Sequence, residues 1–153
     1  MTKQFRYRTP EEAFSARTEQ VGECTIWTGA RSKAGYGQLR VAGRVVYAHR
    51  FAYERTHGPI PEGMVVDHIC HTPACVNAAH LRLATHRQNI ANRSGAQRGR
   101  TQDLPRGVVQ HGARYRAWAA GKSLGVFATP GEASLAAEAG RRAAYGEYAG
   151  GSE

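Results

Sequence analysis

Features that direct a protein to a membrane or out of the cell are absent from this sequence. No apolar run approaches the roughly 18 residues that a membrane-spanning helix needs, and the first residues, MTKQFRYRTPEE, lack the apolar core of a signal peptide. Cysteine is scarce: the 153 residues include three, so any disulfide pairing leaves one over. We therefore expect an intracellular, cytoplasmic protein that is not secreted and has no membrane partner, with reduced thiols available to metal.

Acidic residues are outnumbered by basic ones. The chain carries 12 Asp and Glu against 21 Lys and Arg, a formal net charge of +9 at pH 7. Most of the basic residues are arginine, whose planar guanidinium favours contact with phosphate. An acidic membrane surface could attract the same charge, but the missing apolar runs argue against that partner. A chain of this length suits one medium domain or two small ones.

The stretch VVDHICHTPACVNAAHLRLATHRQN, residues 65–89, gathers side chains suited to metal. Its pattern predicts a strand, a loop and a helix. Cys70, Cys75 and His80 follow a C-x4-C-x4-H spacing, which suits a loop folded around a tetrahedral Zn2+, and Cys24 could be the fourth ligand. The alternative is that the cysteines are ordinary buried residues. The loop offers too little apolar bulk to be fixed by packing, so a metal crosslink is the better explanation.

Two residues with oxygen donors, Asp67 and Asn89, lie near the ends of this stretch. Oxygen ligands suit Mg2+ or a similar hard ion rather than zinc, and His68 is then available as a base. A neutral His68 could take a proton from an attacking water while the cation offsets charge on a phosphate and on the leaving 3'-oxygen. The set can therefore hydrolyse a phosphodiester. The alternative is a histidine that is satisfied by hydrogen bonds within a loop.

These residues resemble the ββα-metal motif of HNH nucleases, and among them the His-Cys box homing endonucleases and phage HNH proteins. The matching residues, in order and spacing, are His68, Cys70, Cys75, Asn77, His80, Leu81 and Asn89. The resemblance implies a DNA endonuclease in which His68 is the general base and Asp67 and Asn89 bind the catalytic Mg2+. It also implies that the Cys75 carbonyl orients the His68 ring. The structural zinc would be bound by Cys24, Cys70, Cys75 and His80.

The chain departs from the His-Cys box pattern at two points. That family has a second zinc cluster after the catalytic asparagine, whereas this chain has no cysteine beyond Cys75. The family also uses an arginine at the scissile phosphate, and the sequence does not single one out. The candidates are Arg31, Arg40, Arg44 and Arg50.

The segment before the motif predicts a short helix, a hairpin and a second helix. The signal from Thr9 to Glu12 should start a helix running from Pro10 to about Arg17. The alternating run GYGQLRVAGRVVYAHR predicts a hairpin that turns at Ala42-Gly43. One face of it should be filled by Leu39, Val41, Val45 and Tyr47.

The run AHRFAYERTHG predicts a helix that ends at Gly58. His49 and Arg50 are its polar outliers, for which we expect a solvated or hydrogen-bonded structural role. Phage HNH proteins have similar W-x-G, G-Y-G and A-H-R runs, so the resemblance extends over about 24–93. We expect residues 1–93 to form the nuclease domain, with its core at 24–93.

A basic linker should follow at 94–104, because the composition is rich in Arg, Gly, Ser and Gln. Arg93, Arg98 and Arg100 give this part of the chain a cationic edge that could lie along a DNA groove or backbone. An ordinary solvated linker is the equal alternative.

The block 105–149 contains three strand-like pieces and a capped, alanine-rich helix. Alternation in ARYRAWAA puts Arg114, Arg116 and Trp118 on one face, which is cationic and can meet a groove. The alternative is a solvated strand face with the helix packed behind it. The block resembles an AP2 DNA-binding domain, which implies a sheet that enters the major groove. The candidate DNA contacts are Arg106, Gln110, Arg114, Arg116, Trp118 and Lys122.

The expected fold class is α+β: a ββα-metal HNH nuclease domain with a structural zinc, followed by a small three-stranded antiparallel sheet with one helix. The function that we predict is a site-directed, homing-type endonuclease that cuts double-stranded DNA with Mg2+, in a bacterial or phage-infected cell. One active site cuts one strand, so a double-strand break would need a homodimer or two successive nicks. The alternatives are a zinc-stabilised DNA-binding protein without catalysis and a nonspecific or structure-selective nuclease.

Overall fold

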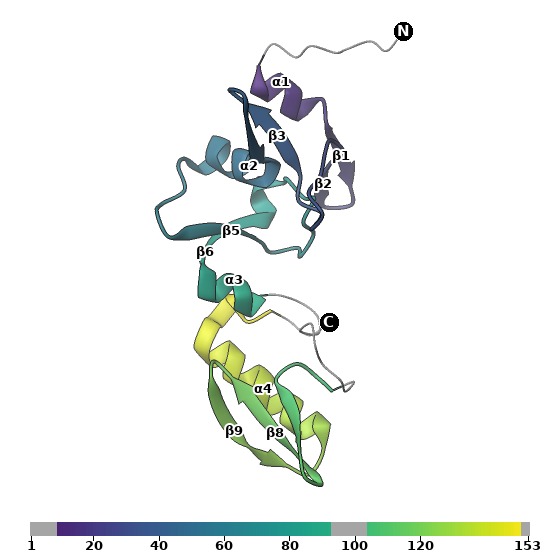
Figure 1. Ribbon diagram of the computed structural model, residues 1–153, viewed down its shortest axis with the longest axis vertical. Helices are drawn as coiled ribbons and strands as arrows, with labels where there is room; N and C mark the ends of the chain where they lie inside the picture. The colour runs from purple at the N-terminus through teal and green to yellow at the C-terminus, as the bar shows by residue number, and fades with distance from the viewer. Residues whose placement is uncertain (1–8, 93–103, 151–153) are drawn as a thin grey trace. The chain divides into compact units, whose positions relative to one another are not determined.

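The computed structural model describes residues 9–92 and 104–150, in which small antiparallel sheets are combined with short helices (Figure 1). The chain divides into two compact units, Met1–Thr85 and His86–Glu153. The mixed α and β content agrees with the predicted class. The expected linker, 94–104, lies almost wholly outside the described residues, and so do Arg93, Arg98 and Arg100. None of the described helices has the length and apolar character required to span a membrane.

The first unit opens with a helix and a hairpin: α1 (Pro10–Ser15), β1 (Thr18–Val21) and β2 (Cys24–Trp27). The Thr9 hydroxyl caps α1, as predicted, by accepting a hydrogen bond from the Glu12 amide at 3.2 Å. The helix ends before Arg17, so it is slightly shorter than expected. Strand β1 was not predicted, because its mostly exposed Thr-Glu-Gln-Val sequence has no apolar alternation and depends on pairing with β2.

A second hairpin follows, made of β3 (Gln38–Val41) and β4 (Arg44–Tyr47). Its turn is the predicted one, at Ala42 and Gly43, whose φ angles are 47° and 80°. Positive φ at both central residues is the requirement of a type I' turn, which matches the twist of the paired strands.

The predicted apolar face of this hairpin is wrong in its second strand. Leu39 is buried and pairs with Val46, and both pack in the core with Val41. Val45 and Tyr47 lie on the opposite face and are 58% and 44% exposed. The reason is that residues paired across two antiparallel strands share a face, and this register pairs the odd-numbered residues of β3 with even-numbered residues of β4.

Helix α2 (Ala48–His57) precedes the metal-ligand stretch. The stretch itself contains β5 (Met64–His68), the 3-10 helix η1 (Ala78–His80) and β6 (Leu81–Thr85), and β5 pairs with β6 in antiparallel orientation. Helix α2 ends at Gly58 as predicted, where φ is 90°, a value that favours glycine. Asp67 and His68 are the last residues of β5, so the strand delivers them to the start of the loop that carries the cysteines.

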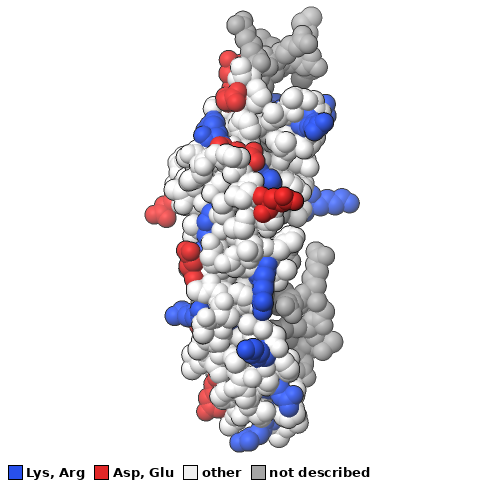
Figure 2. All heavy atoms as spheres, turned by 90° about the vertical axis from the view of Figure 1, so that its left-hand side faces the viewer, with Lys and Arg blue, Asp and Glu red and all other residues white. Residues whose placement is uncertain are grey.

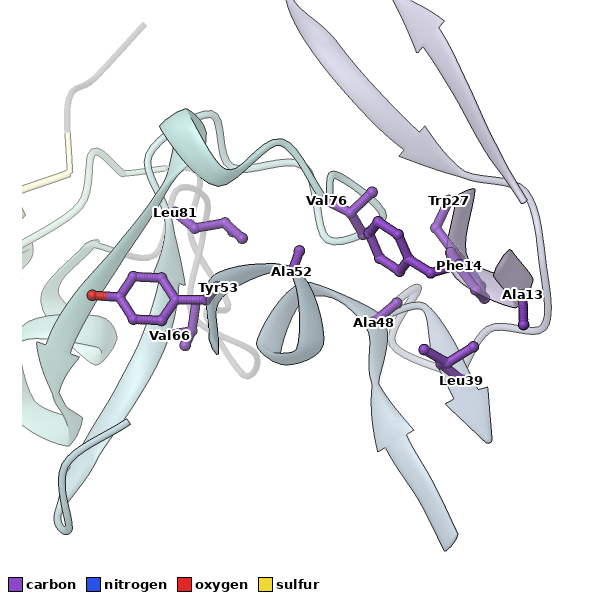
Figure 3. Close-up of a cluster of buried hydrophobic side chains, with 10 residues drawn as sticks. All are labelled: Ala13, Phe14, Trp27, Leu39, Ala48, Ala52, Tyr53, Val66, Val76 and Leu81. Carbon is purple, nitrogen blue, oxygen red and sulfur yellow. The ribbon is translucent and has the colours of Figure 1, made fainter. Parts of the chain in front are cut away.

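In the core of the first unit, Trp27 has no exposed surface and lies beside Phe14 (Figure 3). The Phe14 ring lies 5.7 Å from the Trp27 ring and 5.4 Å from the Phe51 ring. A Cβ at Gly29 or Gly37 would lie 2.7 Å from the indole, so glycine is needed at both positions. The other buried residues of this core are Ala13, Leu39, Ala48, Ala52, Tyr53, Val66, Val76 and Leu81.

In the second unit, the described residues form helical segments and a sheet. The elements are α3 (His86–Asn92), β7 (Val108–His111), β8 (Arg114–Ala119), β9 (Lys122–Phe127), α4 (Pro130–Tyr145) and the 3-10 helix η2 (Gly146–Tyr148). The strands form an antiparallel sheet in the order β7-β8-β9, and α4 packs on one face of it (Figure 1). Thr129 and Glu132 cap α4 reciprocally. The predicted three strands and capped helix are therefore confirmed.

The two faces of β8 differ as the alternation predicted. Ala117 and Ala119 are buried, and Ala117 belongs to the small core that includes Ala133 and Ala137 of α4. Trp118 is 39% exposed on the other face. Alanines on both elements let α4 approach the Ala117 face of the sheet closely.

Candidate functional site

Three cysteines and a histidine of the first unit come together in one group. Cys24 opens β2, Cys70 and Cys75 lie in the loop after β5, and His80 ends η1. One ligand atom from each residue lies within 4.8 Å of the other three. This is the Cys3His set that the sequence predicted for zinc, and it could hold a metal ion.

The separations within this group fit a tetrahedral zinc ion. Zn–S bonds of about 2.3 Å and Zn–N bonds of about 2.0–2.1 Å put sulfur and nitrogen about 3.6 Å apart. His80 Nδ1 lies 3.5 Å from Cys24 Sγ and 3.7 Å from Cys75 Sγ. Burial is the main cause that raises the pKa of the Cys75 thiol to about 12. A cation would reverse this preference, because zinc binds the thiolate and displaces its proton.

The loop that carries the cysteines is hydrogen-bonded to β2. The Trp27 amide donates to the Ala74 carbonyl at 2.8 Å, and the Val76 amide donates to the Thr25 carbonyl at 2.7 Å. The Asn77 side chain donates to the carbonyl in the turn before β2 at 2.9 Å and caps η1 with its oxygen. These bonds bring the cysteine at the start of β2, which is distant in sequence, to the loop.

His68 is held by the same loop. Its Nε2 lies 3.0 Å from the Cys75 carbonyl oxygen, which is the contact expected from the resemblance. A carbonyl only accepts, so Nε2 carries the proton and Nδ1 carries the lone pair of a base. Burial is the largest influence on the pKa of His68 and lowers it, although the Cys75 carbonyl and Asp67 act in the opposite direction. The ring is therefore neutral near pH 7.

Asp67 has a partner that the sequence analysis did not identify. Its Oδ2 lies 3.1 Å from Arg82 Nε, and the two side chains are 6% and 13% exposed. Asp67 and Arg82 are paired residues of β5 and β6. An arginine opposite a buried aspartate is the signal for this pair, and it becomes visible only when β5 and β6 are aligned.

His49 is a second histidine beside His68, at 4.8 Å between ring centroids. Tyr36 lies 5.4 Å from the His49 ring and 5.9 Å from the His68 ring. We expected His49 to be solvated or hydrogen-bonded, but it is 6% exposed, and its Nδ1 has no hydrogen-bond partner in the described part of the chain. Burial, followed by the charges of His68 and Arg50, lowers the pKa of His49 to about 3, so this ring is also neutral.

The remaining predicted nuclease residues lie on other elements. Asn89 lies on α3, in the second unit. Arg31 uses its guanidinium to donate to the Trp27 carbonyl, which is a structural role within its own loop. Arg40 on β3 and Arg44 on β4 are exposed, and Arg50 on α2 is half-buried.

Most of the predicted DNA contacts of the second unit lie on the sheet. Gln110, Arg114 and Lys122 are exposed, and Arg116 contacts His111 Nε2 at 2.9 Å. Arg106 differs from them, because it is half-buried and donates to a carbonyl of α3. On the face in view in Figure 2, Lys and Arg side chains stand apart, with Asp and Glu side chains between some of them. Contacts with a nucleic acid would therefore depend on particular side chains.

Comparison with known proteins supports a nuclease domain in part of the chain. Residues 46–91 match the family model of HNH endonucleases, so the match covers less than a third of the chain. It includes Asp67, His68 and Asn89 and begins after Cys24.

The curated relatives are phage proteins. Protein 7.7 of Escherichia phage T7 is 48% identical over 67 residues, which are 44% of this chain and 52% of that protein. Protein 2.8 of the same phage is 38% identical over 68 residues, 43% of this chain and 45% of that protein. An uncharacterized gene 5.3 protein of Enterobacteria phage T3 is 43% identical over 42 residues, 28% of this chain and 42% of that protein. The chain thus spans about half the length of the curated relatives it matches, and no solved structure matches it significantly.

Proposed function

We propose that this chain is a site-directed DNA endonuclease of the phage homing type, in which a zinc-bound HNH unit cuts and the second unit selects the site. The observation that carries the proposal is the position of His68. Its ring is buried and neutral and is oriented by the Cys75 carbonyl, and the Cys3His group fixes the loop that supplies this carbonyl. An oriented neutral imidazole is the requirement for a general base at neutral pH.

In this mechanism His68 takes a proton from a water molecule, the water oxygen bonds to phosphorus, and the bond from phosphorus to the 3'-oxygen breaks. Carboxylate and amide oxygens suit Mg2+, so Asp67 and Asn89 would hold it. The bound ion would offset the charge on the phosphate and the leaving oxygen. Arg82 pairs with the Asp67 carboxylate and restrains its orientation.

The second unit would supply the choice of site. Arginine is the side chain best suited to reading guanine, and Arg114 and Arg116 lie on the face of β8 that is turned away from α4. The AP2-like arrangement would place this face in the major groove. One active site per chain makes a nick the elementary product, and a homodimer would be needed for a concerted double-strand break.

A second candidate function, a DNA-binding protein without catalysis, is favoured by one observation. The Asp67 carboxylate is already engaged by Arg82, and a permanent ion pair would leave it a poor metal ligand. In that case the Cys3His group would be a scaffold only.

Plasmid cleavage separates the two functions. Wild type, His68→Ala and His57→Ala would each be incubated with supercoiled plasmids carrying host or phage DNA, with and without Mg2+. His57 is exposed on α2 and serves as the matched control. Nicked product that requires Mg2+ and is lost only in His68→Ala supports the nuclease. Tight DNA binding without any cleavage, in chains shown to be folded and zinc-loaded, would support the non-catalytic function instead.

The role of the sheet is tested on the same plasmids. Replacing Arg114 and Arg116 together with Gln should redistribute or reduce the mapped cut sites more than it slows cutting of nonspecific DNA. The matched control is Arg142→Gln, on the exposed side of α4. An unchanged cleavage map in the double variant would count against site selection by the sheet.

A further inference from the structure

The second unit contains a pocket that the cleavage mechanism does not use. It has a volume of about 350 Å³ and is formed by α3, the residues around the start of β7, the β8–β9 turn and the C-terminal part of α4. This size lies within the range of small-molecule sites, about 300–1,000 Å³. None of the described residues that line it is acidic. Its cationic and aromatic lining consists of Arg87, Arg106, Trp118, Arg141 and Tyr145.

Arg141 gives this pocket a buried cation with one unsatisfied N–H group. Its side chain is 7% exposed, and its Nη1 donates to the Arg106 carbonyl at 3.0 Å. Its Nε has no hydrogen-bond partner in the described part of the chain. Glu138 attracts the Arg141 charge from the same helix, but the Glu138 carboxylate is paired with Arg142 at 2.8 Å. A buried guanidinium N–H without an acceptor is costly, and an anion in the pocket could satisfy it.

The position of Arg141 is built into the backbone. Gly107 has a φ of 83°, and a Cβ there would lie 2.6 Å from the Trp118 carbonyl and 3.2 Å from Arg141 Nη1. Glycine therefore lets this segment lie against both β8 and α4, which presents the Arg106 carbonyl to the guanidinium.

Two aromatic rings accompany the cations. The Arg87 guanidinium lies 5.9 Å from the centre of the Tyr145 ring. Trp118 lines the pocket and is also 39% exposed on the outer face of β8, the face that carries Arg114 and Arg116. The pocket therefore adjoins the surface to which we assign DNA contact. A half-exposed tryptophan and guanidinium groups that line one pocket suit a planar base joined to a phosphate.

We propose that this pocket binds one unpaired nucleotide of a DNA strand that lies on the outer face of β8, with the base against Trp118 and the phosphate at Arg87 and Arg141. The inference rests on the proposed DNA binding of the second unit and adds a preference for distorted DNA. A nucleotide already outside the stack enters without the loss of pairing and stacking that a paired nucleotide would suffer. A bulged strand should therefore bind more tightly than a fully paired one.

The test uses the full chain with His68→Ala, so that cutting does not interfere, and two labelled duplexes that differ by one bulged nucleotide. Fluorescence anisotropy should show about tenfold tighter binding of the bulged duplex, given the usual gain from stacking one base on an aromatic ring. Trp118→Ala and Arg87→Gln should abolish this preference, and Arg142→Gln should retain it. Trp118 and the buried Trp27 are the two tryptophans of the chain, so quenching of the exposed indole reports stacking directly.

The outcomes distinguish this inference from the proposed function. Equal, tight binding of both duplexes, or a preference that survives Trp118→Ala, would overturn the pocket assignment while leaving DNA binding intact. Absence of binding to either duplex would overturn both. Adenosine monophosphate serves as the free-nucleotide probe. If it quenched the Trp118 fluorescence as strongly as the bulged duplex does, the pocket would be assigned to a free nucleotide and not to a DNA strand.

Discussion

Replacing His80 with asparagine should remove the metal and unfold much of the first unit. His80 supplies the one nitrogen in a group of three sulfurs, and its Nδ1 is already placed 3.5 Å and 3.7 Å from two of them. His71 offers a matched control, because it is exposed, lies in the same loop and is not part of the group. His71→Asn also suits its φ of 54°, a conformation that asparagine tolerates well.

The expected magnitude follows from what else holds the loop. Three hydrogen bonds join it to β2 and to the turn before β2: Trp27 N to Ala74 O, Val76 N to Thr25 O, and Asn77 Nδ2 to Glu23 O. At about 0.5–1.5 kcal/mol each they contribute roughly 3 kcal/mol. A structural zinc contributes about 10–16 kcal/mol of apparent binding free energy, which exceeds the whole stability of many domains, about 5–15 kcal/mol. The hydrogen bonds alone would not compensate for the lost metal.

Zinc content and thermal unfolding measure the effect. Wild type and His71→Asn should each release close to one zinc ion per chain on denaturation. His80→Asn should release little, and its melting temperature, followed by the near-UV signal of the buried Trp27, should fall by at least about 15 °C or lose its cooperative transition. A His80→Asn chain that keeps its zinc and melts within a few degrees of His71→Asn would refute the ligand assignment.

Three further changes should affect the stability of the first unit. Gly37→Ala should destabilise it by about 1–3 kcal/mol in urea unfolding, since the new Cβ would meet the buried indole. Gly131→Ala, on α4 of the second unit, has room for the Cβ and should not destabilise the chain, so an equal loss in both variants would contradict this. Arg82→Ala should cost about 3–5 kcal/mol, because it leaves the Asp67 charge buried without its ion pair, and a loss below 1 kcal/mol would count against that pair. The pKa of His49 is about 3 in the folded chain and near 6.5 in the unfolded chain. As the pH falls from 6.5 towards 3, the unfolded chain therefore binds a proton that the folded chain does not. The free energy of unfolding should fall by about 1.4 kcal/mol per pH unit over this range. His49→Gln should flatten that dependence, and an identical pH slope in both chains would disprove it.

The metal group could be predicted from sequence because most of its geometry is local. The spacing of Cys70, Cys75 and His80 places them in one loop. The other residues of that loop have too little apolar bulk to fix its conformation by packing. Cys24 could be assigned as the fourth ligand because it is the one other cysteine of the sequence. In the structure, the backbone hydrogen bonds between β2 and the loop bring Cys24 to the other three ligands. The helix caps and glycine turns were predictable for the same reason, since each depends on residues that are close in sequence.

Features that depend on strand register could not be predicted. The pairing of Asp67 with Arg82 depends on the alignment of β5 with β6. Val45 is exposed because the two-residue turn pairs it with Arg40, so that Val46 and not Val45 shares the buried face with Leu39. His49 was misjudged for a related reason. A histidine in the first turn of a helix after a hairpin has no local mark of burial, and its environment is made by Tyr36 and His68 from other segments.

The W-x-G, G-Y-G and A-H-R runs before the nuclease stretch connect the core to the site. Trp27 occupies the space where Gly37 would carry a side chain, and the Gly37 carbonyl accepts a hydrogen bond from the Ala48 amide at 2.9 Å. Ala48 opens α2 and is fully buried, so the next residue, His49, is held with its ring 4.8 Å from His68. A methyl group added at Gly37 should therefore lower the cleavage rate by more than its effect on the folded fraction. Cleavage that tracks the folded fraction alone would show that the tryptophan core and the proposed general base, His68, are independent.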